Sequence, residues 1–176
     1  NVIHIPGTSH NFSFGEDIFK ECHKYGIEPL VTINHFDCPM YLIKKIGGWR
    51  SREMIDYFYK LCKTLFIRYK GLVKYWLTFN EINMILHFPF VAAGLCFEEG
   101  ENETQAMITA VHHQLLASAM ATKLAHEIDS NNQIGCMLAA GSYYPETCKP
   151  EDYWKAICDN REVYVIRFLK ESRLSF

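Results

Sequence analysis

The sequence lacks the features of a nucleic-acid-binding or membrane-spanning protein. Eighteen Lys and Arg residues stand against 20 Asp and Glu residues, a formal net charge of −2, and no basic stripe is present. A phosphate backbone is therefore not an expected partner. The apolar runs, such as 134–140, fall far short of the roughly 20 residues that span a bilayer. We expect neither a membrane span nor a signal peptide before Asn1.

The cysteines lack the spacing of a metal site or a disulfide framework. There are seven of them, with no CxxC pair and no cluster with His. An odd number scattered through apolar segments is typical of reduced thiols in the core of a cytosolic protein. The sequence therefore predicts neither a zinc site nor structural disulfides.

Several catalytic motifs are also missing. The chain has no GxSxG, GxGxxG or GxxxxGK, which leaves a serine hydrolase, a dinucleotide site and a P-loop unsupported. His126-Glu127 lacks the second His of HExxH. The acidic run at 98–103 is interpreted as a solvated loop rather than a metal site.

The composition is that of a globular protein. Over 176 residues, 49% are apolar and 22% are charged, which is typical of about one soluble domain. Hydrophobic periodicity predicts helices at 16–25, from about 51 to 69, at 104–128 and from Pro150. Short apolar runs predict strands at 29–34, 73–79 and 133–140. This alternation predicts an α/β fold of parallel strands with right-handed crossovers.

Polar side chains follow the first two predicted strands. His35 and Asp37 follow one, and Asn80 and Glu81 follow the other. In parallel α/β folds, ligand chemistry lies at the carboxyl ends of the strands. Beside Phe79, partial desolvation of Glu81 would favour its protonated form, as a general acid requires.

Two questions about Glu81 stay open at this level. Its alternative roles are to cap a helix or to pair with Arg68 or Lys74. In a regular strand, Asn80 and Glu81 would also point to opposite faces. A bulge or a strand end would let both face one pocket, and such irregularities are frequent beside active sites.

Two further groups are interpreted as packing residues. Trp49, after two glycines, is most simply a loop anchor in the core, with stacking on a sugar as the alternative. His112 and His113 lie in a helix rich in Ala and Leu, where we expect packing and surface roles.

Three strings in order resemble the landmarks of family 1 glycoside hydrolases. They are HFDCP at 35–39, GGW at 47–49 and WLTFNE at 76–81. The resemblance extends from about Phe19 to about Ile166 and is greatest to bacterial 6-phospho-β-glucosidases. It implies a (β/α)8 TIM barrel that hydrolyses β-glycosides with retention. It also implies a cytoplasmic enzyme of phosphorylated β-glucosides or disaccharides, with no cofactor and no metal.

The resemblance also assigns roles at the matching positions. It implies that Glu81 is the catalytic acid/base, that Asn80 contacts the sugar 2-hydroxyl and that His35 contacts a nearby sugar hydroxyl. A retaining glycosidase needs a second carboxylate, about 5–5.5 Å away, as the nucleophile. The family's nucleophile is a Glu within Thr-Glu-Asn-Gly, and no Glu here has that setting. We therefore expect the chain to be inactive alone.

The chain is short for such a barrel, which usually takes about 250 residues. We expect residues 1–176 to form one partial barrel domain, about helix 2 to helix 5 of the family's barrel, with an atypical tail at 167–176. The alternative function is a non-catalytic half-barrel module for binding or assembly. Its open sheet edges would favour self-association.

Overall fold

The computed structural model describes residues 2–3 and 12–164, so the predicted tail at 167–176 lies outside the described residues. The chain divides into two compact units, Asn1–Met137 and Leu138–Phe176. The first unit contains the sheet, and the second contains the helix α6 (Pro150–Tyr164). Our assignment of the whole chain to one partial barrel domain stays a prediction.

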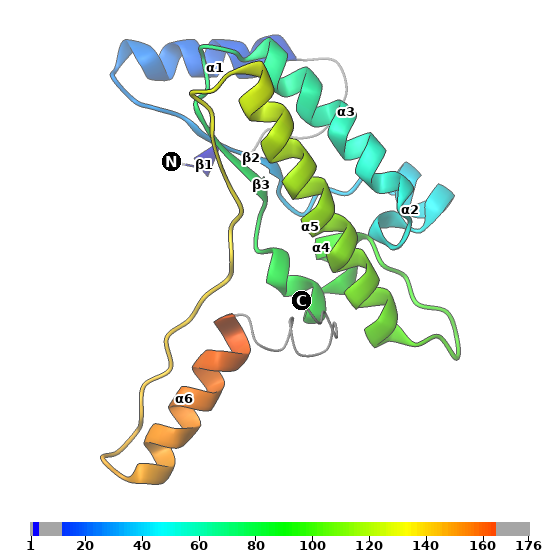
Figure 1. The fold of residues 1–176 in the computed structure, drawn as a ribbon, viewed down its shortest axis with the longest axis vertical. Helices are drawn as coiled ribbons and strands as arrows, with labels where there is room; N and C mark the ends of the chain where they lie inside the picture. The colour runs from blue at the N-terminus through cyan, green and yellow to red at the C-terminus, as the bar shows by residue number, and fades with distance from the viewer. Residues whose placement is uncertain (1, 4–11, 165–176) are drawn as a thin grey trace. The chain divides into compact units, whose positions relative to one another are not determined.

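A parallel sheet organises the first unit (Figure 1). Its strands lie in chain order and are β1 (Val2–Ile3), β2 (Leu30–Asn34), β3 (Tyr75–Phe79) and β4 (Gln133–Gly135). Leu77 lies opposite Thr32 on one side and Gly135 on the other. Because the strands are parallel, the carboxyl ends of β2 and β3 lie side by side. The predicted parallel α/β arrangement is confirmed, although β4 is shorter than the strand predicted at 133–140.

The long helices were predicted well, and the short ones were missed. The predicted helices correspond to α1 (Phe12–Lys24), α3 (Glu53–Arg68), α5 (Glu103–Ile128) and α6. Sequence periodicity did not reveal the short helices α2 (Met40–Ile46) and α4 (Pro89–Ala93), or the 3₁₀ turns η1 (Gly48–Arg50) and η2 (Ile82–Leu86). All four lie in the connections that follow β2 and β3, next to the predicted site.

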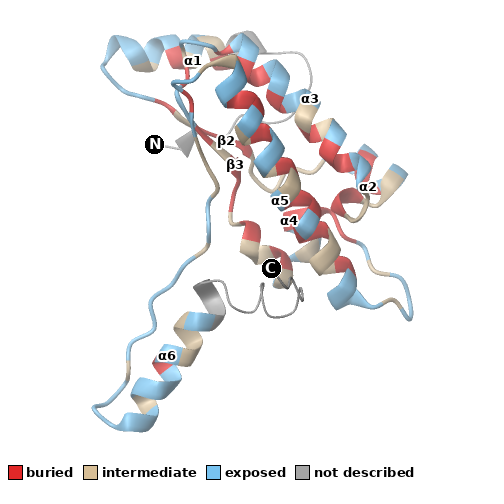
Figure 2. Ribbon diagram, in the orientation of Figure 1, coloured by how far each residue is buried: buried red, intermediate tan, exposed pale blue. Residues whose placement is uncertain are grey.

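Aromatic side chains fill the space between the sheet and the helix α3. The rings of Phe66 and Trp76 lie edge to face with centroids 5.1 Å apart, and Phe58 stacks on Phe79 at 4.6 Å. Trp49 contacts Phe79 at 5.2 Å and is fully buried. Figure 2 shows buried residues on β2 and β3 and on the facing sides of α3 and α5. Trp49 is thus the predicted loop anchor, and its burial excludes stacking on a sugar.

All seven cysteines are free thiols. Cys62 is buried, and desolvation raises the pKa of its thiol. Desolvation and the Asp37 carboxylate raise the pKa of Cys38 to about 11. Cys96 and Cys148 are exposed, so the interpretation of the cysteines as core thiols is wrong for these two.

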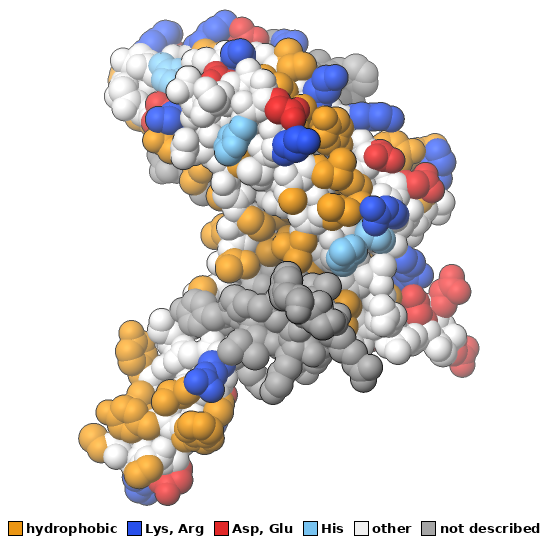
Figure 3. Space-filling model, viewed as in Figure 1, with side chains coloured by type: hydrophobic (Ala, Val, Ile, Leu, Met, Phe, Trp, Pro, Cys, Tyr) orange, Lys and Arg blue, Asp and Glu red, His pale blue; other side chains and the backbone are white. Residues whose placement is uncertain are grey.

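The second unit is a loop fastened to α6. The Asn160 side chain accepts a hydrogen bond from the Tyr143 N–H and donates one to the Tyr143 carbonyl, both at 2.8 Å. The Asp152 carboxylate accepts the hydroxyl and the N–H of Thr147. Large apolar side chains nevertheless stay exposed, such as Tyr144 and Trp154, and Figure 3 shows orange hydrophobic side chains over this unit. No helix in the described part of the chain is long and apolar enough to cross a membrane.

Candidate active site

The ends of β2 and β3 are joined by a backbone hydrogen bond. Asn34, the last residue of β2, lies opposite Phe79, the last residue of β3. The Asn80 N–H then donates to the Asn34 carbonyl at 2.9 Å. The structure therefore places Asn80 beside the residue that precedes His35, at one edge of the sheet.

A bulge follows directly after β3. The Met137 N–H donates to the Phe79 carbonyl at 2.9 Å, and the Met137 carbonyl accepts from the Ile82 N–H at 3.1 Å. Two residues, Asn80 and Glu81, therefore lie opposite one, whereas a regular parallel ladder would place one residue there. This confirms the predicted irregularity. Sequence reasoning missed Met137, because a backbone contact leaves no mark in the side-chain pattern.

Glu81 itself has an uncommon backbone conformation. Its φ is 44° and its ψ 52°, in the left-handed region that non-glycine residues rarely adopt. Such a conformation costs on the order of 1–3 kcal/mol and is frequent at functional sites. Asn80 is buried, while Glu81 is half-buried. The bulge thus turns Glu81 out of the strand without exposing it fully.

The alternative roles of Glu81 are not those observed. Glu81 stands at the N-cap of η2 but makes no side-chain capping bond. Arg68 pairs with Glu16, at 3.7 Å, and the Lys74 ammonium lies over the Tyr75 ring. Neither helix capping nor these two cations therefore explain the presence of a carboxylate at this bulge.

His35 lies in a sharp turn after β2. The next residue, Phe36, has a φ of 64°, and the two rings lie edge to face with centroids 5.8 Å apart. The His35 N–H donates to Oδ1 of Asp37 at 3.0 Å. His35, Phe36 and Asp37 are all half-buried. Positive φ values thus occur in non-glycine residues at both strand ends.

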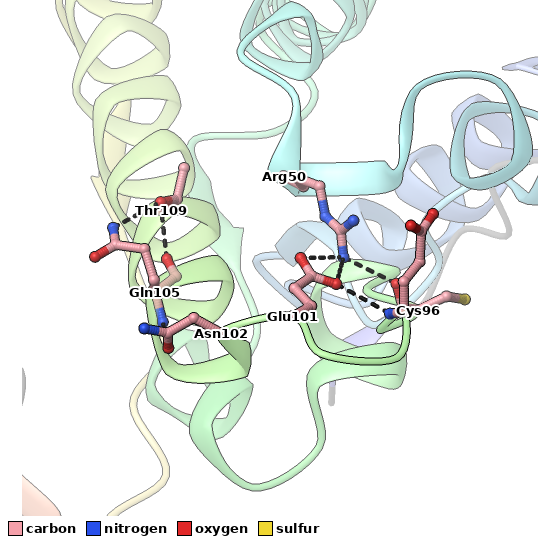
Figure 4. A network of polar contacts seen from close by, with 7 residues as sticks. Arg50, Cys96, Glu101, Asn102, Gln105 and Thr109 are labelled. Atoms are coloured by element: carbon pink, nitrogen blue, oxygen red, sulfur yellow. Dashed lines mark hydrogen bonds and ion pairs between the residues drawn. The ribbon is translucent and has the colours of Figure 1, made fainter.

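The loop after α4 is fastened to the turn η1 (Figure 4). The Arg50 guanidinium pairs with Glu101 at 3.0 Å and donates to the Cys96 carbonyl at 2.8 Å. The same Glu101 carboxylate accepts the N–H of Glu98 at 3.1 Å. Asn102 caps α5 by accepting from the Gln105 N–H. Glu98, Glu99 and Glu103 are exposed, as predicted for a solvated loop, while the half-buried Glu101 is held in place by the Arg50 charge.

Two buried polar side chains of α5 form hydrogen bonds with backbone carbonyls of η1 and α4. His113 Nδ1 lies 2.9 Å from the Trp49 carbonyl, and the Gln114 amide donates to the Ala92 carbonyl at 3.0 Å. Both side chains are buried, while His112 is exposed. The predicted packing and surface roles of this histidine pair are confirmed. These contacts satisfy backbone carbonyls that the short elements leave open.

Comparisons with known proteins are consistent with this geometry. The profile of Glycosyl hydrolase family 1 matches residues 8–172. The 6-phospho-beta-glucosidase AscB of Escherichia coli (strain K12) is 55% identical over 90% of this chain, which corresponds to 33% of that protein. The aryl-phospho-beta-D-glucosidase BglH of Bacillus subtilis (strain 168) is 50% identical over 85% of this chain and 32% of its own length.

A solved structure of a family 1 glycoside hydrolase also matches this chain. A Thermotoga maritima family 1 glycoside hydrolase, complexed with a cyclophellitol analogue transition state mimic, is 30% identical with a TM-score of 0.68. The match covers 87% of this chain and 35% of that one. The chain therefore spans about a third of the length of the relatives that it matches.

Proposed function

Because the chain belongs to glycosyl hydrolase family 1, we propose that it carries the acid/base side of a retaining 6-phospho-β-glucosidase site. The fold is part of the family's TIM barrel, with parallel strands alternating with helices. Curated relatives named 6-phospho-beta-glucosidase support the choice of substrate, a β-glucoside phosphorylated on its sugar. A cytoplasmic location is part of the same proposal.

Glu81 is the general acid/base of this proposal. A single observation carries it: the bulge opposite Met137 turns Asn80 and Glu81 out of the strand ladder at the carboxyl end of β3. In the first step the Glu81 carboxyl group would donate its proton to the leaving glycosidic oxygen. In the second step its carboxylate would take a proton from the attacking water.

Asn80 and His35 hold the sugar in this proposal. The Asn80 amide would hydrogen-bond the 2-hydroxyl, a contact that strengthens in the transition state of glycoside hydrolysis. His35 would hydrogen-bond a neighbouring hydroxyl from the end of β2. The hydrogen bond from the Asn80 N–H to the Asn34 carbonyl joins the ends of the two adjacent strands that these residues follow.

The proposed site lacks a nucleophile within this chain. No Glu occurs in a Thr-Glu-Asn-Gly setting, so nothing here is assigned to attack the anomeric carbon. An acid alone cannot complete a double displacement. The remaining barrel strands of a complete enzyme would supply that carboxylate.

We predict no turnover of a chromogenic 6-phospho-β-glucoside by the purified 176-residue chain. The reason is the missing nucleophilic carboxylate. The measurement is release of the chromophore, with the Glu81→Gln chain assayed in parallel as the background. Turnover that Glu81→Gln abolishes would contradict the prediction and would require a nucleophile elsewhere in the chain.

The complementary test restores the rest of the barrel. In what we call the exchange protein, this chain replaces the matching third of the E. coli relative, which is 55% identical to it. The proposal expects the exchange protein to hydrolyse 6-phospho-β-glucosides. A folded but inactive exchange protein would count against it.

A second candidate function is a non-catalytic half-barrel module for binding or assembly. The observation that favours it is the position of β1 and β4 at the two edges of the described sheet, where unpaired backbone groups invite another strand. This function predicts a concentration-dependent oligomer in sedimentation velocity. A monodisperse monomer over the whole concentration range would contradict it.

A further inference from the structure

Asp37 is a polar residue at these strand ends to which the proposed function gives no role. It is half-buried and follows His35 by two positions. Its Oδ1 accepts the N–H of His35 at 3.0 Å, so the carboxylate faces its own turn. The residue between them, Phe36, has a φ of 64°. A left-handed phenylalanine persists only where its surroundings hold it.

We propose that Asp37 is a positioning residue, which fixes the strained turn after β2 and thereby sets the direction of the His35 side chain toward the sugar. This inference rests on the proposed function for the role of His35. The other assignment for a carboxylate at this edge is a second catalytic group. The two assignments differ in what they need from Asp37, because accepting an N–H needs only an oxygen, whereas nucleophilic attack needs the charge.

Two features of the neighbouring residues bound this turn. On one side, the Asn34 carbonyl is already bonded to the Asn80 N–H, so β2 is held up to that point. On the other side, Pro39 precedes α2 and has no N–H to offer. The hydrogen bond from the His35 N–H to Asp37 therefore lies within the short segment between the end of β2 and the start of α2.

The first test uses the 176-residue chain itself and does not depend on catalysis. Asp37→Asn keeps an oxygen in the place of Oδ1, whereas Asp37→Ala removes it. We expect amide hydrogen exchange at His35 to be at least about tenfold faster in Asp37→Ala than in the wild-type chain, and nearly unchanged in Asp37→Asn. The exposed Asp56 of α3, changed to Ala, is the matched control and should leave His35 exchange unaltered.

The second test measures kcat and KM in the exchange protein. We expect Asp37→Ala to lower kcat/KM by about tenfold or more and Asp37→Asn to stay within about threefold of the wild type. In a His35→Ala background, Asp37→Ala should cost little more, because the two residues act through one contact. The shape of the pH–rate profile should not change, since Asp37 transfers no proton in this scheme.

Failure of the inference and failure of the proposed function look different. Unchanged His35 exchange in Asp37→Ala, or equal losses of kcat/KM in Asp37→Ala and Asp37→Asn, would overturn the positioning role. Full turnover by both single-variant exchange proteins, one carrying Glu81→Gln and the other carrying His35→Ala, would instead overturn the proposed function. If the losses of kcat/KM from Asp37→Ala and His35→Ala add fully in the double variant, Asp37 acts through a general structural effect, and this too would overturn the inference.

Discussion

Replacing Glu81 with Gln in the exchange protein lowers kcat for a 6-phospho-β-glucoside by about 10²–10⁴-fold, the usual contribution of a positioned general acid. Gln is nearly isosteric with Glu and keeps the hydrogen-bonding shape of the side chain. Its amide protons are not acidic, so it cannot protonate the leaving oxygen. The measurement is steady-state kinetics on purified wild-type and variant proteins.

The size of this loss should depend on the leaving group. A nitrophenolate departs readily without a proton, while the alkoxide of a sugar or of methanol does not. The loss in the first chemical step is therefore expected to be larger for a phosphorylated disaccharide than for a nitrophenyl substrate. The limb of the pH–rate profile that reports the acid should also disappear in the Glu81→Gln protein.

The control for this change is Glu99→Gln in the loop between α4 and α5. Because Glu99 is exposed, this substitution removes the same charge from the chain and leaves the bulge unchanged. We expect its kcat to equal that of the wild type. Equal kcat values for Glu81→Gln and the wild type would contradict the acid/base assignment, whatever the Glu99 variant does.

The strained backbone of Glu81 bears on the same assignment. A non-glycine residue with a φ of 44° destabilises the fold relative to a residue with extended backbone. Glycine would adopt this conformation more easily. The backbone of Met137 holds Glu81 there by two hydrogen bonds, one donated to the Phe79 carbonyl and one accepted from the Ile82 N–H. A carboxylate kept at such a position is better explained by chemistry than by packing.

The fold was largely predictable because its long elements carry strong periodic patterns. Residues 53–68 place apolar side chains such as Met54, Phe58 and Leu65 on one buried face, and the structure has α3 there. The short helix α2 has only seven residues and no such repeat. The predicted strand at 133–140 was too long, because apolar residues continue past Gly135 while the regular ladder does not.

The site was predictable in its residues but not in its construction. His35, Asn80 and Glu81 could be named because polar residues at the ends of apolar strands are conspicuous, and because they fall within the family's strings. The two backbone hydrogen bonds that Met137 makes, with Phe79 and Ile82, depend on a strand register across more than 50 positions of sequence, which no local pattern records. The brace from Asp37 depends on the direction of a side chain in a strained turn.

Replacing Gly48 with Ala is expected to destabilise the 176-residue chain by about 2–5 kcal/mol. Gly48 has φ of +63°, and a Cβ there would lie 2.6 Å from the carbonyl oxygens of Ala93 and Gly94. Backbone oxygens cannot swing aside as the end of a side chain can. The substitution therefore adds a collision between η1 and the end of α4 to the penalty of a left-handed alanine. The measurement is the free energy of unfolding from urea transitions.

Gly26 provides a control that separates the two contributions. It has a φ of +67°, almost that of Gly48, but nothing lies within 4 Å of the position of its Cβ. Gly26→Ala should therefore cost only the left-handed conformation, about 1–2 kcal/mol. Equal losses for the two variants would contradict the close approach of η1 to α4. If Gly48→Ala fails to fold while Gly26→Ala folds, the difference is in the expected direction.

The position of Gly48 connects this stability effect to the site. The next residue, Trp49, contacts Phe79, which directly precedes Asn80 and Glu81. A collision at Gly48 would push η1 away from α4 and displace the indole ring that supports the bulge. We therefore expect Gly48→Ala in the exchange protein to lower kcat as well as stability, whereas Gly26→Ala should lower stability alone. Unchanged kcat in a destabilised Gly48→Ala exchange protein would show that the bulge does not depend on this support.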